Sequence, residues 1–392
     1  MPALSRAALL LAASLVAGAA AAEPFTSPAE RAIRAAETVV KARPKEPAGH
    51  HALAMAFARR ARETSDGADY ERAQRALDRA AKIEGQSESS RFDAEKVQIW
   101  ILLGRHEFAA ARDRARALNQ RVPDDVMVYG YLTDASVELG DYGAAEESAQ
   151  WMLDLQAGNV PALTRAAYLR ELFGDPEGAI ELMAQSYERV PPTEVEDRAW
   201  ILTQIGHLSL LQGKQADAER VLEQALALYP GYHYALAGLA RVRYEQRRPD
   251  EALALLRRRY DAAPHPENLF ELARALERAG HADEARRAFA KFEAKALAES
   301  QRADNANREL VFYYADHAHR PADALRIAER EIARRHDVFT RDAYAWALHR
   351  SGRSPEAREQ LDKALAIGVR EPDLIRHRDA IAAALDGVAS AP

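Results

Sequence analysis

The chain has 392 residues, 48% of them hydrophobic and 29% charged, which is the balance of a globular protein rather than a disordered one. The net charge is −6, and basic residues are interleaved with acidic ones at helical spacing, which argues against a nucleic-acid-binding surface. The absence of cysteine excludes disulfides, thiolate catalysis and cysteine-ligated zinc or iron–sulfur centres.

Residues 1–22 have the build of a cleaved secretory signal peptide. Arg6 supplies a positive charge, residues 7–19 form an apolar core, and the alanines at 20–22 offer a cleavage site before Glu23. The apolar core is shorter than the roughly 20 residues that a membrane span needs, so an uncleaved anchor is the less favoured alternative. We therefore expect a periplasmic or secreted protein without a stable membrane span after cleavage.

One pattern then recurs along the chain: a helix, a tight turn, and a second helix with alanine near its start. In "ELGDYGAAEESAQ" (138–150) the turn glycine is Gly140 and the alanine is Ala145, and "LFGDPEGAIELMAQ" (172–185) repeats this frame 34 residues later. Polar insertions explain the longer intervals, because loops between repeats tolerate them. The alanines that share this position are Ala73, Ala111, Ala145, Ala179, Ala218, Ala252, Ala285, Ala324 and Ala357.

The other positions of each unit agree with this reading. A packing residue follows the alanine by four positions, and in most units a small residue precedes it by twelve, on the preceding helix. Two antiparallel helices approach to about 8–10 Å only where their contact residues are small. Prolines stop several of the second helices. These prolines are Pro123, Pro191, Pro230 and Pro264.

This combination of spacing, turn glycine, small contact residues and terminal proline resembles the tetratricopeptide repeat family. The resemblance implies an all-α fold, a right-handed α-solenoid of about nine helix–turn–helix repeats over residues 47–372. Residues 23–46 are expected to form an N-terminal lead-in, 373–387 a capping helix and 388–392 a disordered tail. The register stays open in the first unit and in the unit that contains Phe312, where a small residue is expected.

No motif in the chain carries a reactive constellation. "HEFAA" (106–110) lacks the second histidine of a zinc-protease helix, and "HRD" (377–379) lacks the asparagine of a kinase catalytic loop. The close pairs His50–His51 and His317-x-His319 have no predictable third ligand. We therefore expect no enzymatic activity, no cofactor and no metal site.

The resemblance also implies where a partner would bind. In this family the first helix of each unit lines a concave groove, and the residue after the small contact position points into it. Arginines flanked by aromatics predict a protein or peptide partner that carries acidic groups. The oligomeric state stays open. The candidate groove residues are Asp134, Tyr168, His207, Arg241, Tyr244, Arg274, Tyr313 and Trp346.

We predict a non-enzymatic scaffold that holds protein or peptide partners along this groove, in the periplasm or outside the cell. The alternative is a cell-envelope accessory protein that binds glycan or peptidoglycan and assists an envelope enzyme or assembly machine. Its basis is the set of Tyr168, Tyr313 and Trp346, because aromatic rings stack on sugar faces.

Overall fold

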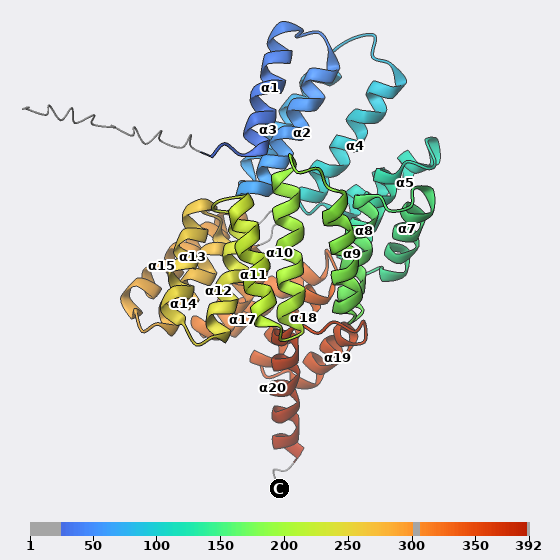
Figure 1. Ribbon diagram of the computed structural model, residues 1–392. Helices are drawn as coiled ribbons and strands as arrows, with labels where there is room; N and C mark the ends of the chain where they lie inside the picture. Colours follow the sequence, from blue (N-terminus) through green and yellow to red (C-terminus); the bar gives the residue numbers. More distant parts are fainter. Residues whose placement is uncertain (1–24, 301–305, 390–392) are drawn as a thin grey trace, which may run out of the picture.

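The computed structural model describes residues 25–300 and 306–389, and within these ranges every regular element is helical (Figure 1). The predicted signal peptide and most of the predicted tail lie outside the described residues. An all-α fold is therefore confirmed for the described part of the chain.

The described helices form nine consecutive pairs between a leading and a closing helix. The pairs are α2 (Pro47–Thr64) with α3 (Ala68–Ala81), α4 (Glu88–Gly104) with α5 (Phe108–Arg121), α6 (Val126–Glu138) with α7 (Tyr142–Leu155), α8 (Val160–Leu172) with α9 (Pro176–Arg189), α10 (Val195–Leu211) with α11 (Gln215–Leu228), α12 (His233–Glu245) with α13 (Pro249–Ala262), α14 (Pro266–Arg278) with α15 (Ala282–Glu299), α16 (Ala306–Phe312) and the π-helical turn η1 (Tyr313–His317) with α17 (Pro321–Ile332), and α18 (Val338–Arg350) with α19 (Ser354–Leu365). The leading helix is α1 (Pro28–Ala42) and the closing helix is α20 (Pro372–Ala389).

The small residues that mark the repeat lie where the two helices of each pair touch. All nine repeat alanines are at most 3% exposed, and the packing residues four positions later are at most 6% exposed. The small residues of the preceding helices, such as Ala167 and Ala345, are also buried. The periodic pattern therefore predicted helix-to-helix contacts correctly.

The turn inside each pair uses a left-handed backbone conformation. Gly140 supplies it in α6–α7 with a φ of 76°, and His106, Arg247 and His319 adopt φ values of 53–60° at the equivalent place of their own pairs. A side chain at positive φ is strained, so these three turns are held by the packing of their helices rather than by a permissive residue.

The unit that contains Phe312 is irregular in the way the sequence indicated. Phe312 ends α16, and the chain continues as η1, in which the amide of Ala318 donates to the carbonyl of Tyr313 over 2.8 Å. The ring of Phe312 lies 5.7 Å from the ring of His377 on the closing helix. The π turn adds one residue to the helical turn directly after it.

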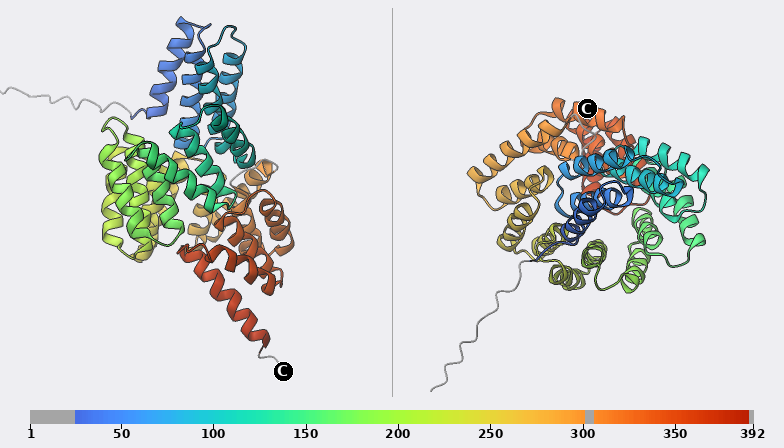
Figure 2. Two further views of the ribbon diagram at one scale, coloured as in Figure 1. Left: turned by 90° about the vertical axis from the view of Figure 1, so that its right-hand side faces the viewer. Right: turned by 90° about the horizontal axis from the view of Figure 1, so that it is seen from above.

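The helix pairs wind into a ring in which the N-terminal pairs lie over the C-terminal ones (Figure 2). Arg62 on α2 reaches Asp197 at the start of α10 over 2.9 Å and also pairs with Glu196, which is fully buried. Arg59 joins the same acidic group through Glu194 at 2.9 Å. The first pair therefore rests directly on the fifth.

Two further contacts join the middle of the array to its C-terminal end. Arg335, in the α17–α18 loop, lies 3.2 Å from Glu138 at the end of α6. A Cβ on Gly174, in the α8–α9 turn, would lie 2.5 Å from the carbonyl oxygen of Gly368, so the two backbones touch. Successive turns of the solenoid are thus in direct contact.

The closing helix α20 packs against the last pair over residues 374–385. Leu374 and Ile381 are buried, and the buried His377 hydrogen-bonds Asp342 of α18 at 2.7 Å. Its C-terminal end extends away from the body of the molecule (Figures 1 and 2). The helix runs to Ala389, two residues beyond its predicted end at 387.

Candidate partner-binding surface

The eight predicted groove residues lie on the first helices of successive pairs, but they fall into separate groups. Asp134 and Tyr168 border one hollow, His207 contacts Arg241, and Tyr244 and Arg274 neighbour Arg278. Tyr313 and Trp346 make local contacts of their own.

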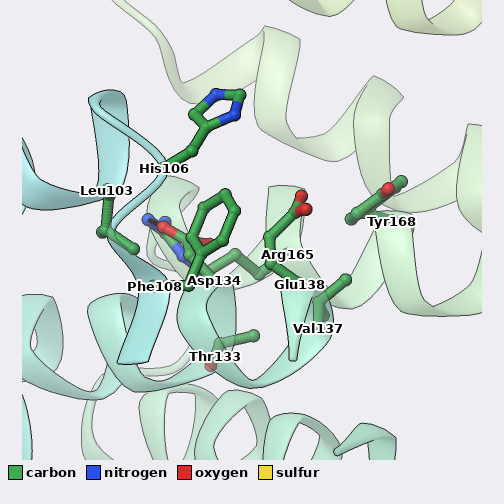
Figure 3. Close-up of a pocket in the computed structure, with 9 residues that line it drawn as sticks. All are labelled: Leu103, His106, Phe108, Thr133, Asp134, Val137, Glu138, Arg165 and Tyr168. Carbon is green, nitrogen blue, oxygen red and sulfur yellow. Dashed lines mark hydrogen bonds and ion pairs between the residues drawn. The ribbon is translucent and has the colours of Figure 1, made fainter. Parts of the chain in front are cut away.

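The hollow has a volume of about 260 Å³ and lies between the turn of the second pair and helices α6 and α8. Figure 3 shows side chains from these different elements, Phe108, Glu138 and Tyr168 among them, around a common space. Its remaining lining residues are Leu103, His106, Thr133, Asp134, Val137 and Arg165.

Asp134 was predicted to face a binding partner. In the structure its partner is Arg165, a residue that the sequence analysis did not name. Its guanidinium binds both carboxylate oxygens of Asp134, over 2.8 and 2.5 Å, and donates to the carbonyls of Gly130 and Pro161 at 3.0 Å. Such a bidentate pair is strong and specific. Asp134 is therefore already paired within the chain.

The electrostatics of the hollow are set by Glu138. Burial, and then the nearby carboxylate of Asp337, raise the pKa of Glu138 to about 7 despite its ion pair with Arg335. Burial likewise raises the pKa of Tyr168 well above its ordinary value, with a further contribution from Glu138. The hollow is thus aromatic and weakly acidic rather than basic.

His207 stands at the centre of a second group. Its Nε2 lies 3.0 Å from Oε1 of Glu171 and 3.1 Å from Oε1 of Glu371, and its Nδ1 lies 3.2 Å from Nη1 of Arg241. Although burial opposes the charged form, the hydrogen bonds that its ring donates to the two carboxylates raise the pKa of His207 to about 9. Arg241 also lies 3.9 Å from Glu371, so the chain itself supplies an acidic group to this predicted groove arginine.

Arg274 differs from Arg241 because no acidic side chain of the described residues lies within 4.0 Å of its guanidinium. It is half-buried and lies over the ring of Phe270, and one turn later Arg278 lies over the ring of Tyr244. Burial, and then the charge of Arg278, lower the pKa of Arg274, which the more distant Asp373 only partly offsets. Two guanidiniums therefore share one surface with aromatic support.

The aromatic residues expected to stack on sugars have their rings against the chain's own side chains. Tyr313 stacks on Phe289 at 5.4 Å, and its hydroxyl lies 3.4 Å from Glu293. Trp346 stacks on His377 at 4.2 Å and donates to Asp316 at 3.0 Å. Tyr168 lies in the hollow. The three rings do not form a common platform.

Several solved structures of other proteins resemble this architecture. The Cut9–Hcn1 hetero-tetramer of the APC/C superposes with a TM-score of 0.51 and 12% identity, over 91% of this chain and 60% of that one. This chain therefore spans about 60% of that protein's length. The human IFIT1 dimer with m7Gppp-AAAA also has a TM-score of 0.51 and 12% identity, over 88% of this chain and 96% of that one.

These likenesses define an all-α solenoid of helix pairs. Residues 209–267 match a family model described as Tetratricopeptide repeat, so the chain carries tetratricopeptide repeats, as the resemblance implied. Such repeats form scaffolds for protein interactions. No curated protein matches the chain in sequence. Among the helices of the described ranges, none combines the length and the apolar character of a membrane span.

Proposed function

We propose that this protein is an exported, non-enzymatic scaffold that binds an acidic segment of a partner protein at Arg274 and Arg278. The solenoid supplies a long surface of fixed shape, and α14 places the two guanidiniums one turn apart on it. The residues around them, Phe270 and Tyr244, hold the charged groups in place without neutralising them.

The observation that carries this proposal is a half-buried arginine with no acidic side chain of the described residues close to it. Removing a cation from water costs free energy, and that cost is usually offset by an acidic neighbour at close range. Arg274 has none within 4.0 Å among the described residues, whereas Arg62, Arg165 and Arg243 all do. An incoming carboxylate would bind both guanidiniums and offset that cost.

Export rests on residues 1–22, whose charge, apolar core and small residues have the pattern of a signal peptide. A fusion of these residues to a reporter that is active only outside the cytoplasm would test it. Export predicts reporter activity and a mature chain that begins near Glu23. A full-length cytoplasmic chain would contradict it.

The binding site can be tested with a fluorescein-labelled oligo-glutamate peptide. We expect saturable binding at physiological salt, weakened at least about tenfold in an Arg274→Gln/Arg278→Gln double variant. The matched control is Arg286→Gln/Arg287→Gln on α15, which removes the same charge from another surface. Equal weakening in both double variants would show unspecific attraction and refute the assignment.

A further inference from the structure

Three side chains from distant parts of the chain converge on one point inside the ring. Glu171 lies on α8, His207 on α10, and Glu371 directly before α20. One ligand atom of each residue lies within 4.8 Å of the others, and Glu171 is buried while His207 and Glu371 are half-buried. Imidazole nitrogen and carboxylate oxygen are the donors that zinc prefers after thiolate.

We propose that Glu171, His207 and Glu371 form a binding site for a divalent transition-metal ion, with Zn²⁺ as the fitting ion. The two nitrogen–oxygen distances at Nε2 are 3.0 and 3.1 Å. In a tetrahedral site with bonds of about 2.0–2.2 Å, neighbouring ligand atoms are about 3.3–3.5 Å apart. Nε2 of His207 therefore needs to separate from each carboxylate oxygen by only a few tenths of an ångström, and the three donor atoms already lie within 4.8 Å of one another.

The charges of the site also suit a cation. Two carboxylates face one nitrogen, and Arg241, the one arginine or lysine of the described residues within 4.0 Å of either carboxylate, lies 3.9 Å from Glu371 and is 46% exposed. When the imidazole gives up its proton, as metal binding requires, the two carboxylates carry one negative charge more than Arg241 balances. A divalent ion removes that excess and ties both carboxylates to the imidazole, whereas a proton on the imidazole only hydrogen-bonds them.

The position of the Arg241 side chain should differ between the metal-free and the metal-bound form of the site. In the structure its Nη1 lies 3.2 Å from Nδ1 of His207, a distance that allows a hydrogen bond only where Nδ1 carries no hydrogen. Metal binding through Nε2 requires the hydrogen on Nδ1 instead. Arg241 then turns from Nδ1 toward solvent or Glu371, and its exposed side chain is free to do so.

A metal ion at this site would connect distant parts of the fold, because its ligands come from the fourth and fifth helix pairs and from the segment that leads into α20. An ion held there would fasten the C-terminal end of the array to its middle. This role is independent of the peptide site at Arg274 and Arg278, so either proposal can fail without the other.

The experiment uses the purified protein without a histidine tag, freed of metal by chelation, and titrates it with ZnCl2 in a calorimeter. We expect one tightly bound Zn²⁺ per chain and a higher unfolding temperature when Zn²⁺ is present. His207→Gln and Glu371→Gln should each lose this binding. Asp373→Asn is the matched control, because its carboxylate pairs with Arg376 and should leave zinc binding unchanged.

Two further measurements keep the outcome clear. Titration with Co²⁺ should give the visible absorption of a low-symmetry site in the wild-type protein and lose it in His207→Gln. Circular dichroism shows whether each variant is folded, and Glu171→Gln serves as a third ligand variant if one is not. The proposal is overturned if no saturable binding occurs below about 1 mM Zn²⁺. It is also overturned if His207→Gln, which keeps the His50–His51 and His317-x-His319 pairs, binds Zn²⁺ as the wild type does.

Discussion

Nη1 of Arg335 lies 3.2 Å from Oε2 of Glu138, although 197 residues separate them. The same contact region includes the amide of Val338, which donates to the hydroxyl of Tyr142 over 2.9 Å. One turn of the solenoid therefore lies against the next at the level of α6. The hollow that Glu138 lines has no residue of α14 in its lining, so it is a separate site from the arginines of α14.

Glu138 should make stability depend on pH. Because its pKa is raised to about 7 in the folded protein from an ordinary 4.5, its contribution is fully present below 4.5 and is lost as pH rises through 7. Glu138→Gln carries no such proton. Unfolding temperatures measured at pH 5 and pH 8 should therefore fall more in the wild type than in the variant. An equal fall in both proteins would contradict the prediction.

Gly174→Ala should loosen the contact between the α8–α9 turn and the C-terminal segment. The new Cβ would lie 2.5 Å from the carbonyl oxygen of Gly368, in addition to the strain of an alanine at a φ of 81°. Gly213→Ala is the control, since φ there is 71° but no atom lies within 4 Å. We expect a cost of about 1–2 kcal/mol in the control and a clearly larger one at Gly174, read from urea unfolding. Equal costs would show that the contact contributes nothing.

Ala285→Leu should destabilise the seventh pair. Ala285 is 3% exposed between α14 and α15, so the larger side chain overpacks the contact at a cost of about 1–3 kcal/mol. Ala282→Leu, on the exposed face of the same helix, should change stability by less than about 0.5 kcal/mol. Chemical unfolding followed by circular dichroism compares the two. A tolerated leucine at 285 would refute the close-contact role of the repeat alanines.

Arg62→Ala should weaken the contact between the first and fifth pairs. Glu196, which is fully buried, then keeps Arg59 at 3.8 Å as a cation and the hydroxyl of Tyr232, which donates to it over 3.1 Å. Breaking a buried pair costs about 3–5 kcal/mol, and we expect the lower end because Arg62 is itself partly exposed. Arg286→Ala removes an exposed pair with Asp283 and serves as the control. Equal unfolding midpoints for the two variants would contradict the prediction.

The repeat could be predicted closely because its pattern depends on residues that are near one another in the sequence. Ala145 and Thr133 are twelve positions apart, and their small size directly reports a close approach of two neighbouring helices. The same local pattern indicated the irregular unit through Phe312. The turn glycine Gly140 was predicted for the same reason.

The contacts between turns of the solenoid could not be predicted in this way. Whether Glu371 meets His207 depends on small rotations between successive pairs, and these accumulate over several repeats. Arg278 was within reach of prediction, because it follows Arg274 by four positions and so lies on the same face of α14. The prediction named only Arg274 on this helix and left Arg278 out.

The contact of the first pair with the fifth changes how the array should fold. In an open solenoid each repeat touches only its neighbours, so terminal repeats can unfold independently of the rest. Here ion pairs join residues 135 and 197 positions apart, which raises contact order and couples both ends to the middle. The chain should therefore unfold in a single cooperative transition rather than by fraying, and fold more slowly than a linear array of the same length.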